Sequence, residues 1–187
     1  MLEQRIQQQI FEGADLQYQG AEALARPVAD AAAAVLGALT AGGKVLLCGG
    51  GSGSGSSPGA GPFLAAYVAQ LFVGGHERER PPLAALALGI EPVPGLRALG
   101  LPGDVLLLID DGLGNCAATI SAAQGKDMTV VVLTGRGAAA VQEWLAETDV
   151  LVTLPAERPA RLAELQLLVL HCLCDAVDFQ LMGEIEP

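Results

Sequence analysis

Lys44 to Cys48 reads KVLLC and runs directly into GGGSGSGSSPGAG at Gly49–Gly61. An apolar run that is too short for a helix and ends in glycines predicts a buried strand followed by a loop. Four more runs of this kind follow along the chain: Leu83–Leu88, Asp104–Ile109, Met128–Leu133 and Asp149–Leu154. Strands that are continuously apolar and alternate with helices are typical of a parallel sheet covered on both faces.

Helical patterns lie before and between these strands. Apolar residues recur at helical spacing from Leu2, and again after Pro27 as far as Leu39, which predicts two N-terminal helices that end at Gly42. Four more helices are expected at 62–73, 116–124, from Gly137 through Trp144, and 159–181. The sequence therefore predicts a three-layer α/β domain over 42–187, preceded by a helical extension over 1–41.

The composition limits the class of protein. With 187 residues, of which 51% are hydrophobic, the chain is expected to form one domain with a large core. Its net charge of −11 disfavours a nucleic-acid partner, because phosphate binding needs clustered Lys and Arg. The most apolar stretch, Leu162–Cys174, contains Glu164 and His171 and is too short to span a membrane, so no membrane partner is expected.

The expected location is the cytoplasm. Met1–Gln9 is polar and lacks the apolar segment of a secretory signal. The four cysteines have no framework spacing and lie among apolar neighbours, so we expect buried free thiols in a reducing compartment: Cys48, Cys116, Cys172 and Cys174.

The glycine-rich loop is the first candidate ligand site. It follows a strand, and ligands of open α/β sheets bind beyond the carboxyl ends of the strands. It contains neither G-x-G-x-x-G nor G-x-x-x-x-G-K-[ST], so no nucleotide cofactor is expected. A solvated loop without a ligand is the alternative.

The loop at Asp110–Asn115 is the second candidate. Its paired aspartates could bind a divalent cation or act as acid and base, or they could simply form a turn that caps the next helix. No second acidic cluster lies nearby in sequence, so no metal is expected. Two carboxylates also disfavour a phosphate here, because they repel an anion.

The chain has two histidines, and neither belongs to a recognisable catalytic motif. His171 lies in the apolar pattern of the last helix and is expected in the core or at an interface. His76 lies in the charged segment GGHERER and is expected to be solvated.

Several segments together resemble the sugar isomerase (SIS) domain family. They are KVLLCGGG, HERERPPLAALAL, GDVLLLID, MTVVVLTG and LLVLHCLCDAVD, in this order. They are most similar to the branch that contains phosphoheptose isomerase and the DnaA initiator-associating protein. The resemblance implies a flavodoxin-like sheet of five parallel strands, and a homotetramer or dimer with sugar-phosphate sites between subunits.

The same resemblance marks departures at the expected site. The catalytic Glu of the family falls at Leu71 and its catalytic His at Gln166, with Glu164 retained. The family's Asn in the first loop falls at Gly50, and its hydroxyl-rich phosphate loop has become the Asp110–Cys116 segment. No catalytic residue is therefore carried over. The residues that remain as ligand-binding candidates are Gly49, Gly50, Gly51, Ser52, Asp110, Asp111, Gly114, Asn115, Glu164 and Gln166.

These departures favour a catalytically degenerate protein that associates with the replication initiator DnaA. The corresponding partner contact falls at Leu181 and Met182, which could equally pack on their own subunit. The alternative is a sugar-phosphate-binding protein, or an isomerase of the phosphoheptose type, whose site was rebuilt from Asp110, Asp111 and serines of the first loop.

Overall fold

The computed structural model describes residues 1–50, 59–111 and 116–184. In this part of the chain, five parallel strands form one sheet in the order β2-β1-β3-β4-β5. The strands are β1 (Val45–Gly49), β2 (Ala85–Ala87), β3 (Val105–Ile109), β4 (Thr129–Thr134) and β5 (Val150–Thr153). All five lie within one or two residues of their predicted bounds, and the strand order is that of the expected flavodoxin-like sheet.

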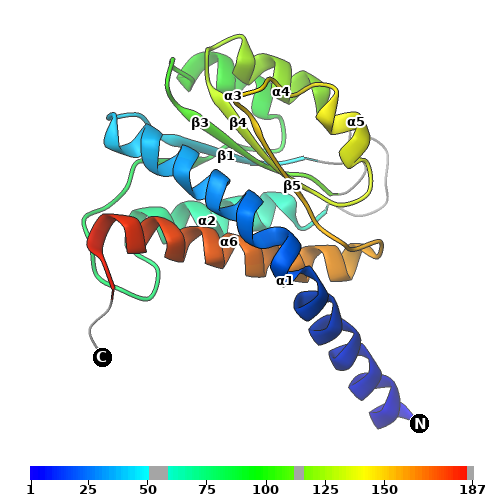
Figure 1. Ribbon diagram of the computed structural model, residues 1–187. Coiled ribbons are helices and arrows are strands. Elements are labelled where there is room, and N and C mark those ends of the chain that lie inside the picture. The colour runs from blue at the N-terminus through cyan, green and yellow to red at the C-terminus, as the bar shows by residue number, and fades with distance from the viewer. Residues whose placement is uncertain (51–58, 112–115, 185–187) are drawn as a thin grey trace.

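Helices cover both faces of the sheet (Figure 1). One layer contains α1 (Leu2–Thr40), α2 (Gly61–Gly74) and α6 (Pro159–Met182). The other contains α3 (Pro92–Leu99), α4 (Ala117–Gln124) and α5 (Ala138–Gln142). The sequence did not predict α3, whose first four residues include Pro92, Pro94 and Gly95.

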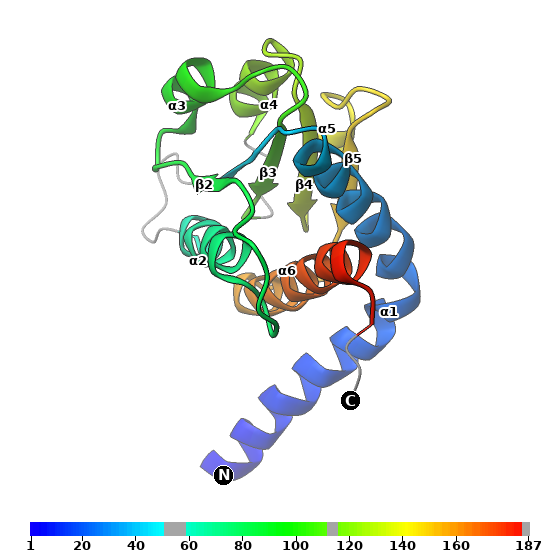
Figure 2. The same cartoon turned by 90° about the vertical axis from the view of Figure 1, so that its left-hand side faces the viewer.

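The N-terminal segment forms one helix, and the prediction of two was wrong. Pro27 lies inside α1 and supplies no N–H to the helix, yet the helical path continues through it. The packing explains the continuity, because Leu24 and Val28 on either side of Pro27 are buried in the same core. The N-terminal half of α1 projects away from the body of the molecule (Figure 2).

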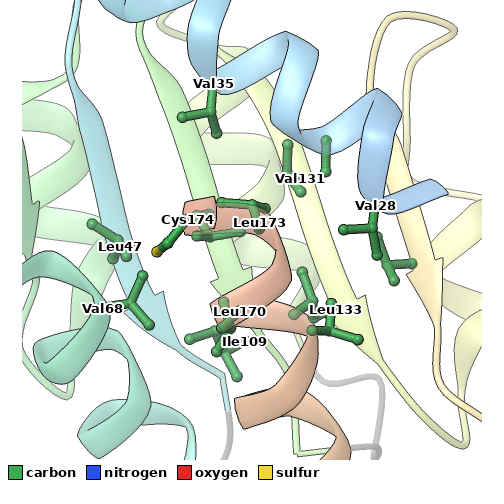
Figure 3. Packing of buried hydrophobic residues seen from close by; sticks show 14 of the residues in the cluster. Val28, Val35, Leu47, Val68, Ile109, Val131, Leu133, Leu170, Leu173 and Cys174 are labelled. Atoms are coloured by element: carbon green, nitrogen blue, oxygen red, sulfur yellow. The ribbon is translucent and has the colours of Figure 1, made fainter. Parts of the chain in front are cut away.

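Successive residues of the strands face opposite layers of helices. Leu47, Leu107 and Ile109 pack with α1, α2 and α6 in the larger core cluster. Leu46, Leu106 and Leu108 pack with α3 and α4 in the smaller one. Figure 3 shows Leu170, Leu173 and Cys174 of α6 lying over the larger cluster. This alternation explains why the strands have no polar face.

Two helices, α1 and α6, are long and apolar enough to cross a membrane by length and composition alone. Helix α6 passes this test because it is a core helix. It packs against α1 and α2, and its residues Leu165, Leu170 and Leu173 are buried under the sheet.

Candidate active site

The two candidate loops meet where the direction of the strand order changes. Gly50, directly after β1, donates its N–H to the carbonyl of Ile109 at the end of β3 (2.8 Å). A Cβ added at Gly50 would lie 3.3 Å from Asp110 Oδ1. This point between β1 and β3 is the position where open α/β sheets of this order bind their ligands.

Two glycines allow helix α2 to begin directly against the ends of these strands. A Cβ on Gly49 would lie 2.1 Å from the nitrogen of Pro62, and one on Gly61 would lie 2.6 Å from the carbonyl oxygen of Ile109. Both contacts are with backbone atoms, so a larger residue would force the chain apart. Gly49 therefore serves the packing of α2, which is a structural role beside its predicted ligand-binding one.

Asp110 points into the protein and not toward solvent. Its residue is fully buried, and Thr134 at the end of β4 donates a hydrogen bond from Oγ1 to Asp110 Oδ2 (2.5 Å). Asp111 is only partly buried and lies close to Gly59, whose added Cβ would be 3.1 Å from the Cβ of Asp111. The carboxylate of Asp110 therefore belongs to an internal hydrogen-bond network.

Gln166 belongs to the same buried network. It donates a hydrogen bond from Nε2 to the backbone carbonyl of Asp110 (2.5 Å), which links α6 to the end of β3. The amide is buried and has no ionisable proton near neutral pH, so its role is to position α6. Leu71, the other position where the resemblance implied a catalytic residue, packs partly buried against the larger core cluster.

Glu164 lies on a different side of α6 and faces the projecting part of α1. Arg161 pairs with it (Nη2 to Oε1, 2.8 Å) and also donates to the carbonyl of Gln9 (2.9 Å). Arg161 and Glu164 line a groove of 490 Å³ between α6 and α1. The α1 residues that line it are Ile6, Gln9, Ile10, Gly13, Ala14 and Gln17. The structure thus separates Glu164 from Gln166, which the sequence had placed in one site.

The structure brings the two histidines together between α2 and α6. Tyr67 Oη and His171 Nε2 share a hydrogen bond of 3.0 Å. The ring of His76 stacks on that of His171, with 5.2 Å between centroids and 20° between planes, and Tyr67 meets His171 edge-on. His171 is partly exposed, so it is not a core residue, and its place at an interface stays a prediction. His76 packs against His171 and is not simply solvated, so that prediction is corrected.

This cluster was missed because each of its members was judged alone. Tyr67 precedes Leu71 by four residues, so the two lie on one face of α2, a turn apart. The resemblance implied a catalytic Glu at Leu71. The same face of α2 therefore carries the hydroxyl of Tyr67 one turn before that position. The available signal was that both histidines of the chain lie inside segments that carry the SIS resemblance, HERERPPLAALAL and LLVLHCLCDAVD.

Some predicted features lie outside the described residues or differ from prediction. Gly51, Ser52, Gly114 and Asn115 lie outside them. Within the described ranges, no group of three or more His, Cys, Asp or Glu side chains could hold a metal ion. Cys48, Cys116 and Cys174 are buried free thiols as predicted, but Cys172 is exposed because it lies on the outer face of α6.

Comparisons with known proteins identify the family. No protein-family model matches the chain. The chain is 49% identical to the phosphoheptose isomerase of Methylibium petroleiphilum over 202 aligned positions, covering 98% of this chain and 97% of that one. It belongs to the phosphoheptose isomerase family. The phosphoheptose isomerase of Aromatoleum aromaticum is 38% identical, with 96% of each chain covered. The solved phosphoheptose isomerase structure from Neisseria gonorrhoeae superposes with a TM-score of 0.81 at 29% identity, covering 95% of this chain and 99% of that one.

These relatives overturn the favoured functional prediction. A degenerate, DnaA-associating protein was inferred from the departures at Leu71, Gln166, Gly50 and the Asp110–Cys116 segment, but the similar proteins are named as enzymes. The prediction treated each departure from the aligned family pattern as a loss of function, and the identity to these proteins does not support that step. Leu181 packs partly buried against its own core and Met182 is exposed at the end of α6.

Proposed function

We propose that this protein is a sugar-phosphate isomerase of the phosphoheptose type, with His171 and Tyr67 beside the reacting carbons. The observation that carries the proposal is the Tyr67–His171 hydrogen bond in a chain of this family. The coarser conclusion, that the chain is a phosphoheptose isomerase homologue, rests on the identity alone.

An aldose–ketose isomerisation moves one proton between neighbouring carbons and one between their oxygens. A base removes the proton next to the carbonyl, an enediol forms, and the proton returns to the adjacent carbon. His171 suits the carbon proton, because histidine is the side chain that most often acts as a general base. The Tyr67 hydroxyl is within hydrogen-bond distance of that imidazole and suits the oxygen proton.

The path from the strand ends to His171 is short. Gln166 of α6 contacts the end of β3 through its hydrogen bond to the carbonyl of Asp110. His171 follows Gln166 by five residues, which is a helical rise of about 7.5 Å. A sugar phosphate with its phosphate near Gly50 and Gly59 could therefore extend along α2 toward His171. The sequence analysis expected Asp110 and Asp111 to repel a phosphate at this loop. The carboxylate of Asp110 points inward and bonds to Thr134, so it does not face a phosphate bound there.

Self-association accompanies this proposal. Apolar side chains on the projecting half of α1 are exposed: Leu2, Ile6, Ile10, Phe11 and Tyr18. An apolar stripe of this kind on a helix that leaves its own domain is typical of a subunit interface. We propose a homo-oligomer in the cytoplasm, with the site near its interface and no cofactor.

The test is turnover in deuterated water. A ketoheptose phosphate is incubated with the protein, and NMR follows aldose formation and deuterium incorporation at the carbon next to the carbonyl. We expect both with the wild-type protein, and a loss of about 100-fold or more in His171→Asn. Cys172→Ser, a neighbouring exposed position on α6, is the matched control and should remain active. Binding of the sugar without turnover or exchange would instead indicate a sugar-phosphate-binding protein.

A further inference from the structure

The ring of His76 stacks on one face of the His171 ring, and no other aromatic ring in the described part of the chain covers that face. The two imidazoles are stacked, whereas Tyr67 meets the same ring edge-on, with 5.6 Å between centroids and 68° between planes. Aromatic rings at such separations attract one another in stacked and edge-to-face arrangements. His171 is thus held at a face by His76 and at Nε2 by Tyr67.

The loop that carries His76 is fixed independently of the stack. Gly75, at φ +98°, ends α2 and donates its N–H to the carbonyl of Leu71 (2.9 Å). Glu77 follows at φ +41°, a conformation that is uncommon for a residue other than glycine. The backbone N–H of Arg78 donates to the carbonyl of His76. These bonds define a tight turn with His76 near its apex.

Two arginines then fasten the turn to the end of α6. Arg78 donates from Nη1 to the carbonyls of Gly183 (2.9 Å) and Asp178 (3.4 Å). Arg80 forms a buried ion pair with Asp178. The turn is therefore attached to the same helix that carries His171, so His76 and His171 keep a constant relative position.

We infer that His76 is a positioning residue for His171, which it orients by stacking so that Nε2 faces Tyr67 and the substrate. This inference rests on the proposed function. Stacking uses the ring face and leaves the nitrogens of His76 without a required part in proton transfer. An aromatic ring without nitrogens should therefore replace His76, and a small or non-aromatic side chain should not.

The kinetic test compares three substitutions in the isomerisation assay. For His76→Ala we expect a fall in kcat of about tenfold with KM within about twofold, because misorientation of the base affects the reacting step more than binding. His76→Phe should restore kcat to within about twofold of the wild-type value. Glu79→Gln, an exposed position in the same turn, is the control and should be unchanged.

A second readout does not depend on turnover. With only two histidines in the chain, ¹⁵N-histidine NMR gives two pairs of ring-nitrogen signals, one pair per imidazole, and His171→Asn assigns them. We expect a single fixed tautomer for His171 in the wild type and in His76→Phe, and averaged tautomers in His76→Ala. An unchanged tautomer in His76→Ala would overturn the inference even if the protein proved inactive, and a Phe variant as slow as the Ala variant would overturn it in favour of a direct proton-transfer role. Loss of turnover in the wild type alone would overturn only the proposed function.

Discussion

Arg80 and Asp178 form an ion pair that is almost completely buried, with Nε and Oδ1 2.5 Å apart and the side chains 1% and 3% exposed. The same guanidinium donates to the carbonyls of Phe72 and Leu71 at the end of α2. One arginine therefore joins the two segments, HERERPP and LHCLCDAVD, that carried the resemblance to the family.

The first prediction concerns this pair. Asp178→Asn removes the charge that compensates a buried guanidinium, and we expect the free energy of unfolding to fall by about 3–5 kcal/mol. Urea denaturation followed by circular dichroism measures it. Arg26→Ala, which removes an exposed pair with Asp30, is the control and should cost under about 0.5 kcal/mol. If both variants lost the same free energy of unfolding, the buried pair would be no more important for stability than the exposed one, which would contradict the prediction.

The second prediction concerns the close approach of α2 to the strands. In Gly61→Ala the new Cβ would overlap the backbone at Ile109, so we expect destabilisation of about 1–3 kcal/mol and lower activity. Gly37→Ala in α1 adds a methyl where nothing lies within 4 Å, and it should stabilise by about 0.5–1 kcal/mol. The melting temperatures of the two variants in thermal unfolding should therefore shift in opposite directions. An unchanged melting temperature in Gly61→Ala would contradict the prediction and show that the strand end can move.

The sequence predicted the sheet well but did not predict the contact between Tyr67 and His171, for identifiable physical reasons. A strand such as KVLLC is buried on both faces, so its composition alone reveals it. The Tyr67–His171 contact joins residues 104 positions apart and depends on how α2 packs against α6. No local pattern encodes that packing, and the resemblance directed attention to Leu71 and Gln166 instead. Helix α3 was missed because its prolines are typical of turns.

The third prediction concerns the thiols. Burial raises the pKa of Cys48, Cys116 and Cys174 from 9.0 to about 12. A neighbouring group adds to the effect in each case: Cys116 for Cys48, Asp110 and Asp111 for Cys116, and Asp178 for Cys174. The thiolate is the reactive form, so at most one thiol of the native protein, the exposed Cys172, should react quickly with a disulfide reagent at pH 8. All four should react after unfolding in urea. Fast reaction of two or more thiols in the native state would contradict this burial.

The same pKa shifts predict a fall in stability at alkaline pH. The unfolded chain releases these thiol protons near pH 9 and the folded one only near 12, so the unfolded state is favoured increasingly between these values. The stability that the neutral thiols contribute is complete below about pH 9. Cys174→Ala should show a shallower decline from pH 9 to 11 in denaturant midpoints. An identical slope would argue against the raised value.

The fourth prediction concerns Asp104 at acid pH. Burial alone would raise the pKa of this carboxyl, but hydrogen bonds from Lys44 Nζ (2.6 Å) and from the N–H groups of Leu101 and Lys44 lower it overall. Its contribution to stability is therefore present above about pH 4 and is lost as the pH falls through the lowered value. Asp104→Asn should cost about 2 kcal/mol at pH 7 and little at pH 2. Asp127→Asn, at an exposed site with φ +54°, should be neutral at both.

The fifth prediction concerns self-association through α1. Ile6 and Ile10 are exposed, lie one turn apart and line the groove beside Arg161 and Glu164. The double variant Ile6→Gln/Ile10→Gln should lower the molar mass measured by light scattering at micromolar concentration, because polar side chains weaken an apolar interface. The fold should survive, since the buried part of α1 begins further along the helix and packs on the sheet. Gln7→Ala, exposed on the same helix, should leave the molar mass unchanged, and a monomeric wild-type protein would contradict the prediction.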